Sequence, residues 1–252
     1  MPDSPRPLAG RRIAVTRPHE QAAQLAAALE RLGATVSIVP LVEIVPVEDS
    51  TELDHAFRKL GRYDWVVFTS VNGVAAIGDR LRAPAQLEGA RVAAVGPATA
   101  AAVGELGVEP AFVPDTHDGR ALAEGLDGLD GQRVLLPQGD LASPFLADEL
   151  RDRGAIVDAV VAYRTVSREP SGDELRELEG ADAIVLASGS AARSLAAALA
   201  DAERIGEAFL VCIGPRTAEV AVEEGLRVGV VADDASADGI IQALTTHFGG
   251  SP

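Results

Sequence analysis

The sequence contains very little cysteine, lysine or aromatic residue. Cys212 is the only cysteine, Lys59 is the only lysine, and aromatic residues make up 4% of the 252 positions. A single cysteine excludes an internal disulfide framework and fits a reducing compartment. Because Cys212 stands inside the apolar stretch FLVCIGP, we expect it to be a small buried strand residue rather than a nucleophile.

Long apolar runs and clustered positive charge are also missing. No stretch approaches the ~18 consecutive apolar residues that a membrane helix needs. The N-terminal MPDSPRPLAGRR lacks the apolar centre of a secretory signal. The formal net charge of −16 disfavours nucleic acid as a partner, because phosphate binding needs clustered cations. We therefore expect a cytoplasmic protein that binds neither membranes nor nucleic acid.

The motifs of common cofactor sites are absent as well. No GxxxxGK[ST] sequence occurs, and no GxGxxG follows a strand and opens a helix, so a nucleotide cofactor has little support. The four histidines, His19, His55, His117 and His247, are scattered and lack the spacing of metal ligands. No GxSxG nucleophile elbow is present, although a Ser–His–Asp triad stays open. The sequence thus predicts a site without a metal or a cofactor.

What the sequence has in abundance is a regular alternation of strands and helices. Short β-rich runs such as RRIAVT (11–16) and DWVVFT (64–69) are separated by helical patterns rich in alanine and leucine. One such helix is bounded by Pro18 at its start and Gly33 at its end. This alternation, with 47% hydrophobic residues, is typical of an α/β fold whose parallel sheets are covered by helices on both faces.

Parts of the chain occur twice. A Gly-Pro-x-Thr step follows an apolar run at 96–99 and again at 214–217, an offset of 118 residues. DWVVFTSVNGVAAI (64–77) matches DAIVLASGSAARSL (182–195) at the same offset. Residues 11–36 match the later stretch QRVLLPQGDLASPFLADELRDRGAIV at an offset of 121. The order is therefore A, B, A′, B′, which indicates duplication of a doubly wound α/β unit rather than a solenoid.

Two extended stretches mark the predicted domain boundaries. PLVEIVPVED (40–49) and AVVAYRTVSREP (159–170) each follow an A segment and contain proline. We expect the chain to leave one domain through the first stretch and to return to it through the second. Tyr163 lies in the second stretch, where a phenol could serve as a weak acid or simply pack at a domain junction. The predicted domains are residues 1–42 with 167–252, and residues 43–166.

Candidate ligand-binding residues follow the predicted strands. In open parallel sheets, ligands bind beyond the carboxyl ends of the strands. Ser, Thr and Pro at these positions are ordinary helix caps, but several helix starts on one side also offer many N–H groups to anions. A ligand with several carboxylates would suit such a surface. The candidates are Arg17, Ser70, Asn72, Gly96, Thr99, Gln138, Ser188, Ser190 and Thr217.

A set of short motifs follows a distinctive order and spacing. It comprises VTRP (15–18), GATVSIVPLVEI (33–44), YDWVVFTSVNGV (63–74), VAAVGPATAAAV (92–103), VLLPQGD (134–140), VVAYRTV (160–166) and CIGPRTAEVAVEEGL (212–226). Through this set the chain resembles the uroporphyrinogen-III synthase family from about Gly10 to Leu244. The second copy departs from the family's Phe-Thr-Ser pattern, because it reads Leu186-Ala187-Ser188. A hydroxyl at 187 therefore has no role here.

The resemblance implies two flavodoxin-like, doubly wound parallel-sheet domains joined by a two-stranded β-ladder. It implies that A pairs with B′ and B with A′, so that the two Gly-Pro-x-Thr steps belong to different domains and face one cleft. It also implies a substrate, hydroxymethylbilane, which is a linear tetrapyrrole with eight carboxylates. The family closes this substrate with loss of water and inversion of the last pyrrole ring, without a metal or a cofactor.

The resemblance also assigns roles to individual residues. A ladder tyrosine of the family, which matches Tyr163, is the favoured acid for departure of the hydroxyl, and family hydroxyl positions match Ser70 and Thr99. A monomer is the expected state. A different class of function stays open, namely a non-catalytic two-domain protein that binds a tetrapyrrole or a small anion. Turnover of hydroxymethylbilane distinguishes the two.

Overall fold

The chain forms two compact units. The computed structural model describes residues 6–87, 89–199 and 208–249. Unit 1 comprises Met1–Glu43 and Val166–Pro252, and unit 2 comprises Ile44–Thr165. The predicted domain boundaries, after residues 42 and 166, each lie one residue from a boundary of these units. Residues 1–5, 200–207 and 250–252 of the first predicted domain are outside the described residues. That the units behave as separate domains stays a prediction.

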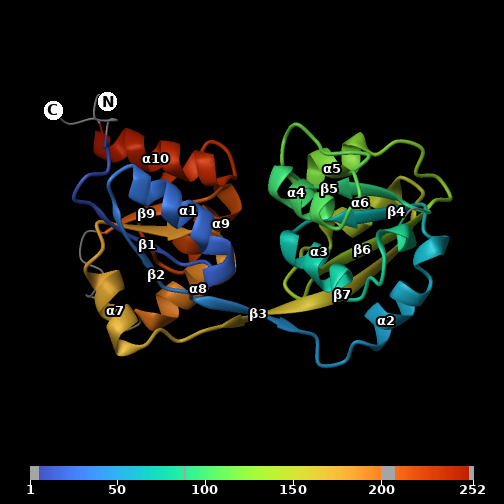
Figure 1. The fold of residues 1–252 in the computed structure, drawn as a ribbon, viewed down its shortest axis with the longest axis horizontal. Helices are drawn as coiled ribbons and strands as arrows, with labels where there is room; N and C mark the ends of the chain where they lie inside the picture. Colours follow the sequence, from blue (N-terminus) through green and yellow to red (C-terminus); the bar gives the residue numbers. More distant parts are fainter. Residues whose placement is uncertain (1–5, 88, 200–207, 250–252) are drawn as a thin grey trace. The chain divides into compact units, whose positions relative to one another are not determined.

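Unit 1 is built on a five-stranded sheet in the order β10-β9-β8-β1-β2, with parallel neighbours (Figure 1). Its strands are β1 (Arg12–Val15), β2 (Thr35–Ile38), β8 (Ala183–Leu186), β9 (Phe209–Cys212) and β10 (Val228–Val231). Alternate strand residues face opposite sides, so Ala14 packs into one apolar cluster while Ile13 and Val15 pack into another. One face carries α1 (His19–Arg31) and α10 (Ala237–Gly249), and the other carries α7 (Gly172–Glu179), α8 (Gly189–Ala198) and α9 (Pro215–Glu223).

Unit 2 has a second five-stranded sheet, in the order β3-β7-β6-β4-β5. Its strands are β3 (Val42–Pro46), β4 (Trp65–Phe68), β5 (Arg91–Ala94), β6 (Arg133–Gly139) and β7 (Ile156–Ser167). On β4, Val66 and Phe68 pack toward α2 (Thr51–Arg58), α3 (Val71–Gly78) and α4 (Pro97–Glu105). Trp65 and Val67 pack toward α5 (Gly119–Gly125) and α6 (Phe145–Asp152). Short 3₁₀ helices cover Leu60–Arg62 and Pro84–Gln86.

The two sheets exchange the duplicated segments. Strands β1 and β2 of segment A pair with β8, β9 and β10 of B′, whereas β4 and β5 of segment B pair with β6 and β7 of A′. The register is also repeated, since Arg12 pairs with Thr35 and Arg133 pairs with Ile156, each 121 residues further along the chain. The predicted α/β fold and the predicted pairing of A with B′ and B with A′ are therefore confirmed.

The two sheets differ at one edge. Where unit 1 has β10, unit 2 has only a single parallel bridge between Ala93 and Phe112. Pro110 and Pro114 flank this bridge, and proline has no backbone N–H to donate to a strand ladder. The two prolines thus remove ladder donors on both sides of the bridge, and β3 supplies the fifth strand of unit 2 at the opposite edge.

Strands β3 and β7 carry the chain from one unit to the other (Figure 1). The N–H of Arg168 donates to Leu41 O at 3.0 Å, while the guanidinium of Arg164 pairs with Glu48. Residue numbers thus rise along one strand as they fall along the other, so the two strands run antiparallel. Both unit boundaries fall within or directly beside these strands, which form the predicted two-stranded ladder.

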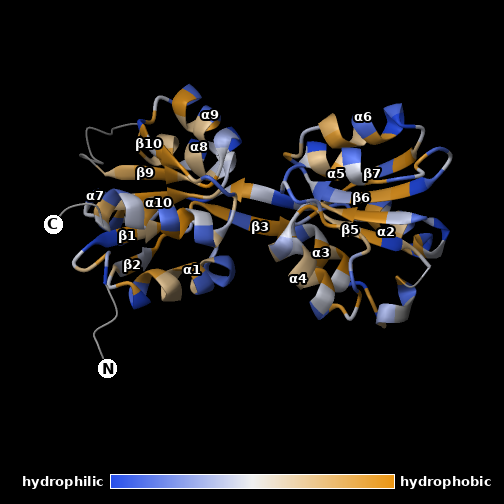
Figure 2. Ribbon diagram, turned by 90° about the horizontal axis from the view of Figure 1, so that it is seen from above, coloured by the Kyte–Doolittle hydropathy of each residue, from blue (hydrophilic) through white to orange (hydrophobic). Residues whose placement is uncertain are grey.

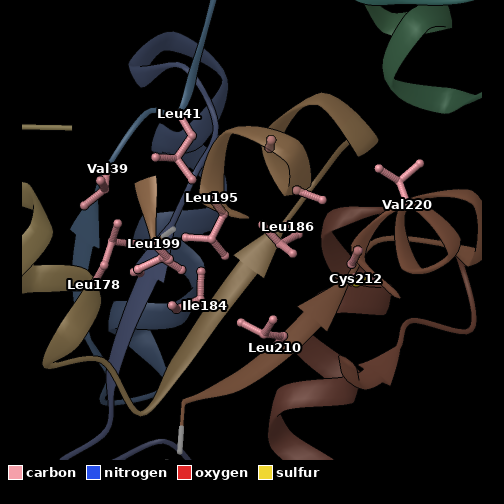
Figure 3. Packing of buried hydrophobic residues seen from close by; sticks show 14 residues of the cluster. Val39, Leu41, Leu178, Ile184, Leu186, Leu195, Leu199, Leu210, Cys212 and Val220 are labelled. Carbon is pink, nitrogen blue, oxygen red and sulfur yellow. The ribbon is translucent and has the colours of Figure 1, made fainter. Parts of the chain in front are cut away.

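Each sheet is apolar along its strands, whereas the helices carry polar residues on their outer sides (Figure 2). One core cluster of unit 1 gathers Ile184, Leu186, Leu195, Leu210 and Cys212 around β8, β9 and α8 (Figure 3). Cys212 is fully buried, and this burial raises the pKa of its thiol to about 11. The predicted role of Cys212 as a buried strand residue is confirmed.

Unit-specific probes can test whether the units unfold separately. Leu186→Ala should remove about 2–5 kcal/mol of unfolding free energy from unit 1, because it truncates a fully buried core side chain. Trp65, the only tryptophan, reports on unit 2, and Cys212, the only thiol, reports on unit 1. In a urea titration of Leu186→Ala, we expect Cys212 to be labelled at a lower urea concentration than in the wild type, while the midpoint of the Trp65 fluorescence change stays the same. Leu135→Ala in unit 2 should give the reverse pattern; equal shifts of both signals would show one cooperative unit instead.

Candidate active site

The predicted site residues lie at the carboxyl edges of the two sheets. In unit 2, Ser70, Gly96 and Gln138 stand at or just beyond the ends of β4, β5 and β6, which run parallel. In unit 1, Arg17 and Ser188 follow β1 and β8 in the same way. We call the two groups the unit 2 edge and the unit 1 edge. The unit 2 edge comprises Ser70, Asn72, Gly96, Thr99, Gln138 and Tyr163, and the unit 1 edge comprises Arg17, Ser188, Ser190 and Thr217.

Ser70 joins a helix start to the predicted catalytic tyrosine. As the N-cap of α3 it has extended backbone angles, and its Oγ accepts a hydrogen bond from Gly73 N at 3.1 Å. The same Oγ lies 3.0 Å from Tyr163 Oη, within hydrogen-bond distance, and either hydroxyl can donate. Two of the predicted residues, 93 positions apart, are therefore in direct contact.

Backbone pairing between β6 and β7 fixes the position of Tyr163. Gly139 pairs with Tyr163 after an irregularity in the register between Gln138 and Gly139. Beyond this pair, Asp140 N donates to Tyr163 O at 3.1 Å, and Thr165 N donates to Asp140 Oδ1 at 2.9 Å. Tyr163 is half-buried, and it packs against the apolar cluster that contains Phe68 and Val160.

At the start of α4, Gly96 lies against His117, a residue that precedes α5 and that the sequence did not point to. Gly96 caps α4, Thr99 is buried in its first turn, and a β-carbon on residue 96 would lie 3.1 Å from His117 Cβ. From the sequence, His117 is a candidate only for metal binding, because no spacing links it to Gly96. The repeat could have revealed this neighbour. At the offset of 118, Gly96 and His117 correspond to Gly214 and Ala235, and Ala235 is likewise the residue nearest to a β-carbon built at Gly214.

The unit 1 edge repeats the capping geometry of unit 2. Ser188 caps α8 with φ and ψ of −162° and 157°, against −161° and 155° for Ser70. Its Oγ accepts from Ala191 N at 3.1 Å and lies 3.0 Å from Ser190 Oγ. Thr217 is buried in the first turn of α9, as Thr99 is in α4. The duplication therefore preserves the helix starts but gives the capping serines different partners.

Arg17 and Thr16 follow β1 and have separate roles. Thr16 is fully buried, and its Oγ1 donates to Val185 O at 2.7 Å, which ties β1 to β8. Burial lowers the pKa of Arg17 from its ordinary value, because the surrounding protein removes water from the guanidinium. An anionic ligand would favour the charged form of this side chain, and Thr16 is a structural residue.

Tyr63, the second tyrosine of the chain, has a structural environment at the other end of its sheet. It precedes β4, is buried, and donates its phenol to Asp158 Oδ2 at 2.7 Å. Burial, with the bond to Asp158, raises the pKa of Tyr63 well above its ordinary value. Of the two phenols, only that of Tyr163 lies at a carboxyl edge.

Three further features of the described residues concern a cavity, metal binding and membrane spans. A cavity of about 470 Å³ in unit 1 opens at the amino ends of β1, β8 and β9, near Arg12, Asp182 and Phe209, away from the predicted residues. Within the described ranges, no three His, Cys, Asp or Glu side chains gather where they could hold a metal ion. Across the same part of the chain, no helix has the length and apolar character to cross a membrane.

Comparisons with known proteins bear on the identity of the chain. A family model described as uroporphyrinogen-III synthase HemD matches residues 23–242. The porphyrin biosynthesis protein HemD of Ruminiclostridium josui is 31% identical over 98% of this chain, and the uroporphyrinogen-III synthase of Synechococcus elongatus is 30% identical over 94%. The chain spans 50% of the length of the first protein and 96% of the second.

The fold has a counterpart among solved structures. A crystal structure of a mutant uroporphyrinogen III synthase from the extremely thermophilic bacterium Thermus thermophilus matches with a TM-score of 0.62 and 21% identity, covering 94% of this chain and 98% of that one. At this identity the likeness concerns the fold. The family model covers most of the sequence, and a uroporphyrinogen-III synthase of nearly equal length is 30% identical to it. The chain therefore belongs to the uroporphyrinogen-III synthase family, the hydro-lyases of tetrapyrrole biosynthesis.

Proposed function

We propose that Tyr163 and Ser70 carry the water-loss step when this chain converts hydroxymethylbilane into uroporphyrinogen III. The observation that carries the proposal is the 3.0 Å contact between Ser70 Oγ and Tyr163 Oη at the carboxyl edge of the sheet. It brings a weak acid, a second hydroxyl and a helix start to one point. The reaction is that of the family, and the phenol of Tyr163 is a group that can protonate the departing hydroxyl.

The reaction needs a proton at one atom of the substrate. Electrons of the terminal pyrrole nitrogen expel the hydroxyl, and the phenol proton of Tyr163 converts this hydroxyl into water. The azafulvenium cation that remains is attacked by the substituted α-carbon of the last pyrrole, and this bond closes a spiro intermediate. The bond between that carbon and its original methylene bridge then breaks, and the bridge bonds to the unsubstituted α-carbon of the same ring, which inverts the ring. That carbon loses its proton as the pyrrole regains its aromatic system, and this proton restores the phenol. A phenol hydroxyl that lies within hydrogen-bond reach of the departing oxygen can act as a general acid.

Ser70 suits the transfer because of how its oxygen is already used. One lone pair of Oγ accepts from Gly73 N, and the hydroxyl has a single proton of its own. If that proton points to Tyr163 Oη, the phenol keeps its own proton for the departing hydroxyl. After transfer, the same bond stabilises the phenolate, since hydrogen bonds to charged acceptors are the stronger ones. The start of α3 adds a favourable potential for negative charge.

The remaining candidate residues suit the carboxylates of the substrate. Helix starts present N–H groups and favour anions, and Ser188, Thr99 and Thr217 stand at three of them. Arg17 adds a partly buried guanidinium whose charged form an anion would favour. We propose the same binding role for the other predicted residues, Asn72, Gly96, Gln138 and Ser190. Positioning of a bound substrate in this way can supply much of the rate, with the acid as an aid.

The proposal includes a monomeric enzyme that acts in the cytoplasm. The unpaired, fully buried Cys212 is compatible with a reducing compartment. The alternative, a protein that binds a tetrapyrrole or a small anion without turnover, has less support. A pure binder has no need of the contact between Ser70 and Tyr163, and the family is one of enzymes.

The purified chain, without added metal or nucleotide, should convert fresh hydroxymethylbilane into the type III isomer. Free hydroxymethylbilane closes to the type I isomer without inversion, so isomer analysis of the product separates the enzyme from the binder. Product of type I only, at the rate seen without protein, would leave the binding alternative standing.

Tyr163→Phe should lower kcat about ten-fold or more while the fold survives. General acids contribute roughly 10²–10⁴-fold, and the push of the pyrrole nitrogen makes this acid helpful rather than essential. Turnover at saturating substrate measures the effect. Wild-type kcat in this variant would remove the tyrosine from the mechanism and leave positioning as the source of catalysis.

The duplication offers a matched pair in Ser70→Ala and Ser188→Ala. Both variants lose the same helix cap, so each should lose about 1 kcal/mol of unfolding free energy in urea titrations. Ser70→Ala should also lower kcat, by less than Tyr163→Phe does. Thr99→Ala and Ser188→Ala, which alter proposed carboxylate-binding helix starts, should act mainly on KM. Equal kcat losses in the two serine variants would mean that capping alone explains Ser70.

A further inference from the structure

We infer that Gly139 is a positioning residue for Tyr163, because the absence of a side chain at 139 lets the phenol ring lie across the end of β6 and reach Ser70. The inference rests on the proposed function, since it concerns how the proposed acid is aimed. It adds a residue from a different strand, one that touches neither substrate nor proton.

The space beside Gly139 is filled by the ring itself. A β-carbon on residue 139 would lie 2.8 Å from Tyr163 Cε2, 2.9 Å from Cζ and 3.0 Å from Oη. The two separations to carbon are shorter than two carbon atoms tolerate without a shift, and the separation to Oη is tight; all three involve the distal part of one side chain. Any side chain at 139 therefore competes for the volume that the phenol occupies.

The backbone gives no other reason for glycine at this position. Gly139 has no positive φ angle, so an alanine could adopt its conformation. Residue 139 is buried at the end of β6 and pairs with Tyr163 across the ladder. The lack of a side chain serves the contact with Tyr163 rather than a turn.

The duplicated segment shows what the sheet looks like without this pair. At the offset of 121, Gly139 corresponds to Pro18 and Tyr163 corresponds to Val42. In unit 1, β1 ends at Val15, and Pro18 caps α1 instead of extending a strand. In unit 2, β6 continues to Gly139 and keeps its partner strand beside it. The glycine and the tyrosine therefore occur together in one copy and are both replaced in the other.

Gly139→Ala should move the phenol and break its contact with Ser70. The ring is the movable neighbour, because the strand backbone on both sides is held in the ladder. We expect kcat to fall about ten-fold, to the level of Tyr163→Phe, with KM close to wild type. The double variant Gly139→Ala/Tyr163→Phe should be no slower than Tyr163→Phe, since both changes remove the same interaction.

A spectroscopic readout separates positioning from a general loss of structure. The chain has two tyrosines, so protein labelled with 3-fluorotyrosine gives two ¹⁹F resonances, and Tyr163→Phe assigns them. Gly139→Ala should shift the Tyr163 resonance and leave that of Tyr63 unchanged. Gly61→Ala is the matched control, because a β-carbon at 61 meets no atom within 4 Å, and it should change neither resonance nor kcat. An unshifted Tyr163 resonance in Gly139→Ala would overturn the inference.

A stability cycle keeps the test decisive if Gly139→Ala folds poorly. Replacing the ring in Gly139→Ala/Tyr163→Ala makes room for the new methyl group, so its unfolding midpoint should equal that of Tyr163→Ala. A loss that persists in this pair would show that the glycine serves the backbone instead. If Tyr163→Phe has wild-type turnover, the acid role fails, and the resonance shift still decides whether Gly139 aims the ring.

Discussion

The parallel pairing of β6 with both β4 and β7 is the constraint on which the candidate site depends. Parallel strands end at one edge, so the residue that follows β4 and a residue late in β7 meet there. Ser70 follows β4 of segment B, and Tyr163 lies 93 positions later on β7 of segment A′. They meet because segments B and A′ share one sheet in unit 2. The proposed chemistry therefore depends on this topology.

The capping serine shows how a structural residue can acquire a second task. Both copies need an oxygen at the start of the helix, and Ser70 and Ser188 meet this need with nearly equal backbone angles. A serine hydroxyl that accepts from the helix still has its own proton to give. In unit 1 that hydroxyl lies beside Ser190, and in unit 2 it lies beside Tyr163. The local geometry is thus the same in both copies, and the neighbour determines its use.

Periodicity and repeats predicted the strands, the helices and the exchange of segments, because these follow from local patterns and a fixed offset. The contact between Ser70 and Tyr163 was beyond such reasoning, since it depends on the irregular register between Gln138 and Gly139. The reduction of β10 to a single bridge in unit 2 could have been predicted from Pro110 and Pro114, whose lack of N–H groups weakens a strand ladder. The contact between His117 and Gly96 could not be predicted from motifs, because none links the two positions.

The differences between the two copies separate charge from proton donation. Arg17 of unit 1 corresponds to the neutral Gln138 of unit 2, and Val42 of unit 1 corresponds to Tyr163. A guanidinium suits the binding of a carboxylate, whereas a phenol can give up a proton, so the two copies supply different chemistry. Arg164, the residue beside Tyr163 in sequence, is paired with Glu48, so its charge is offset. The copy that contains the phenol therefore has no counterpart of the partly buried guanidinium, and the copy that contains the guanidinium has no counterpart of the phenol.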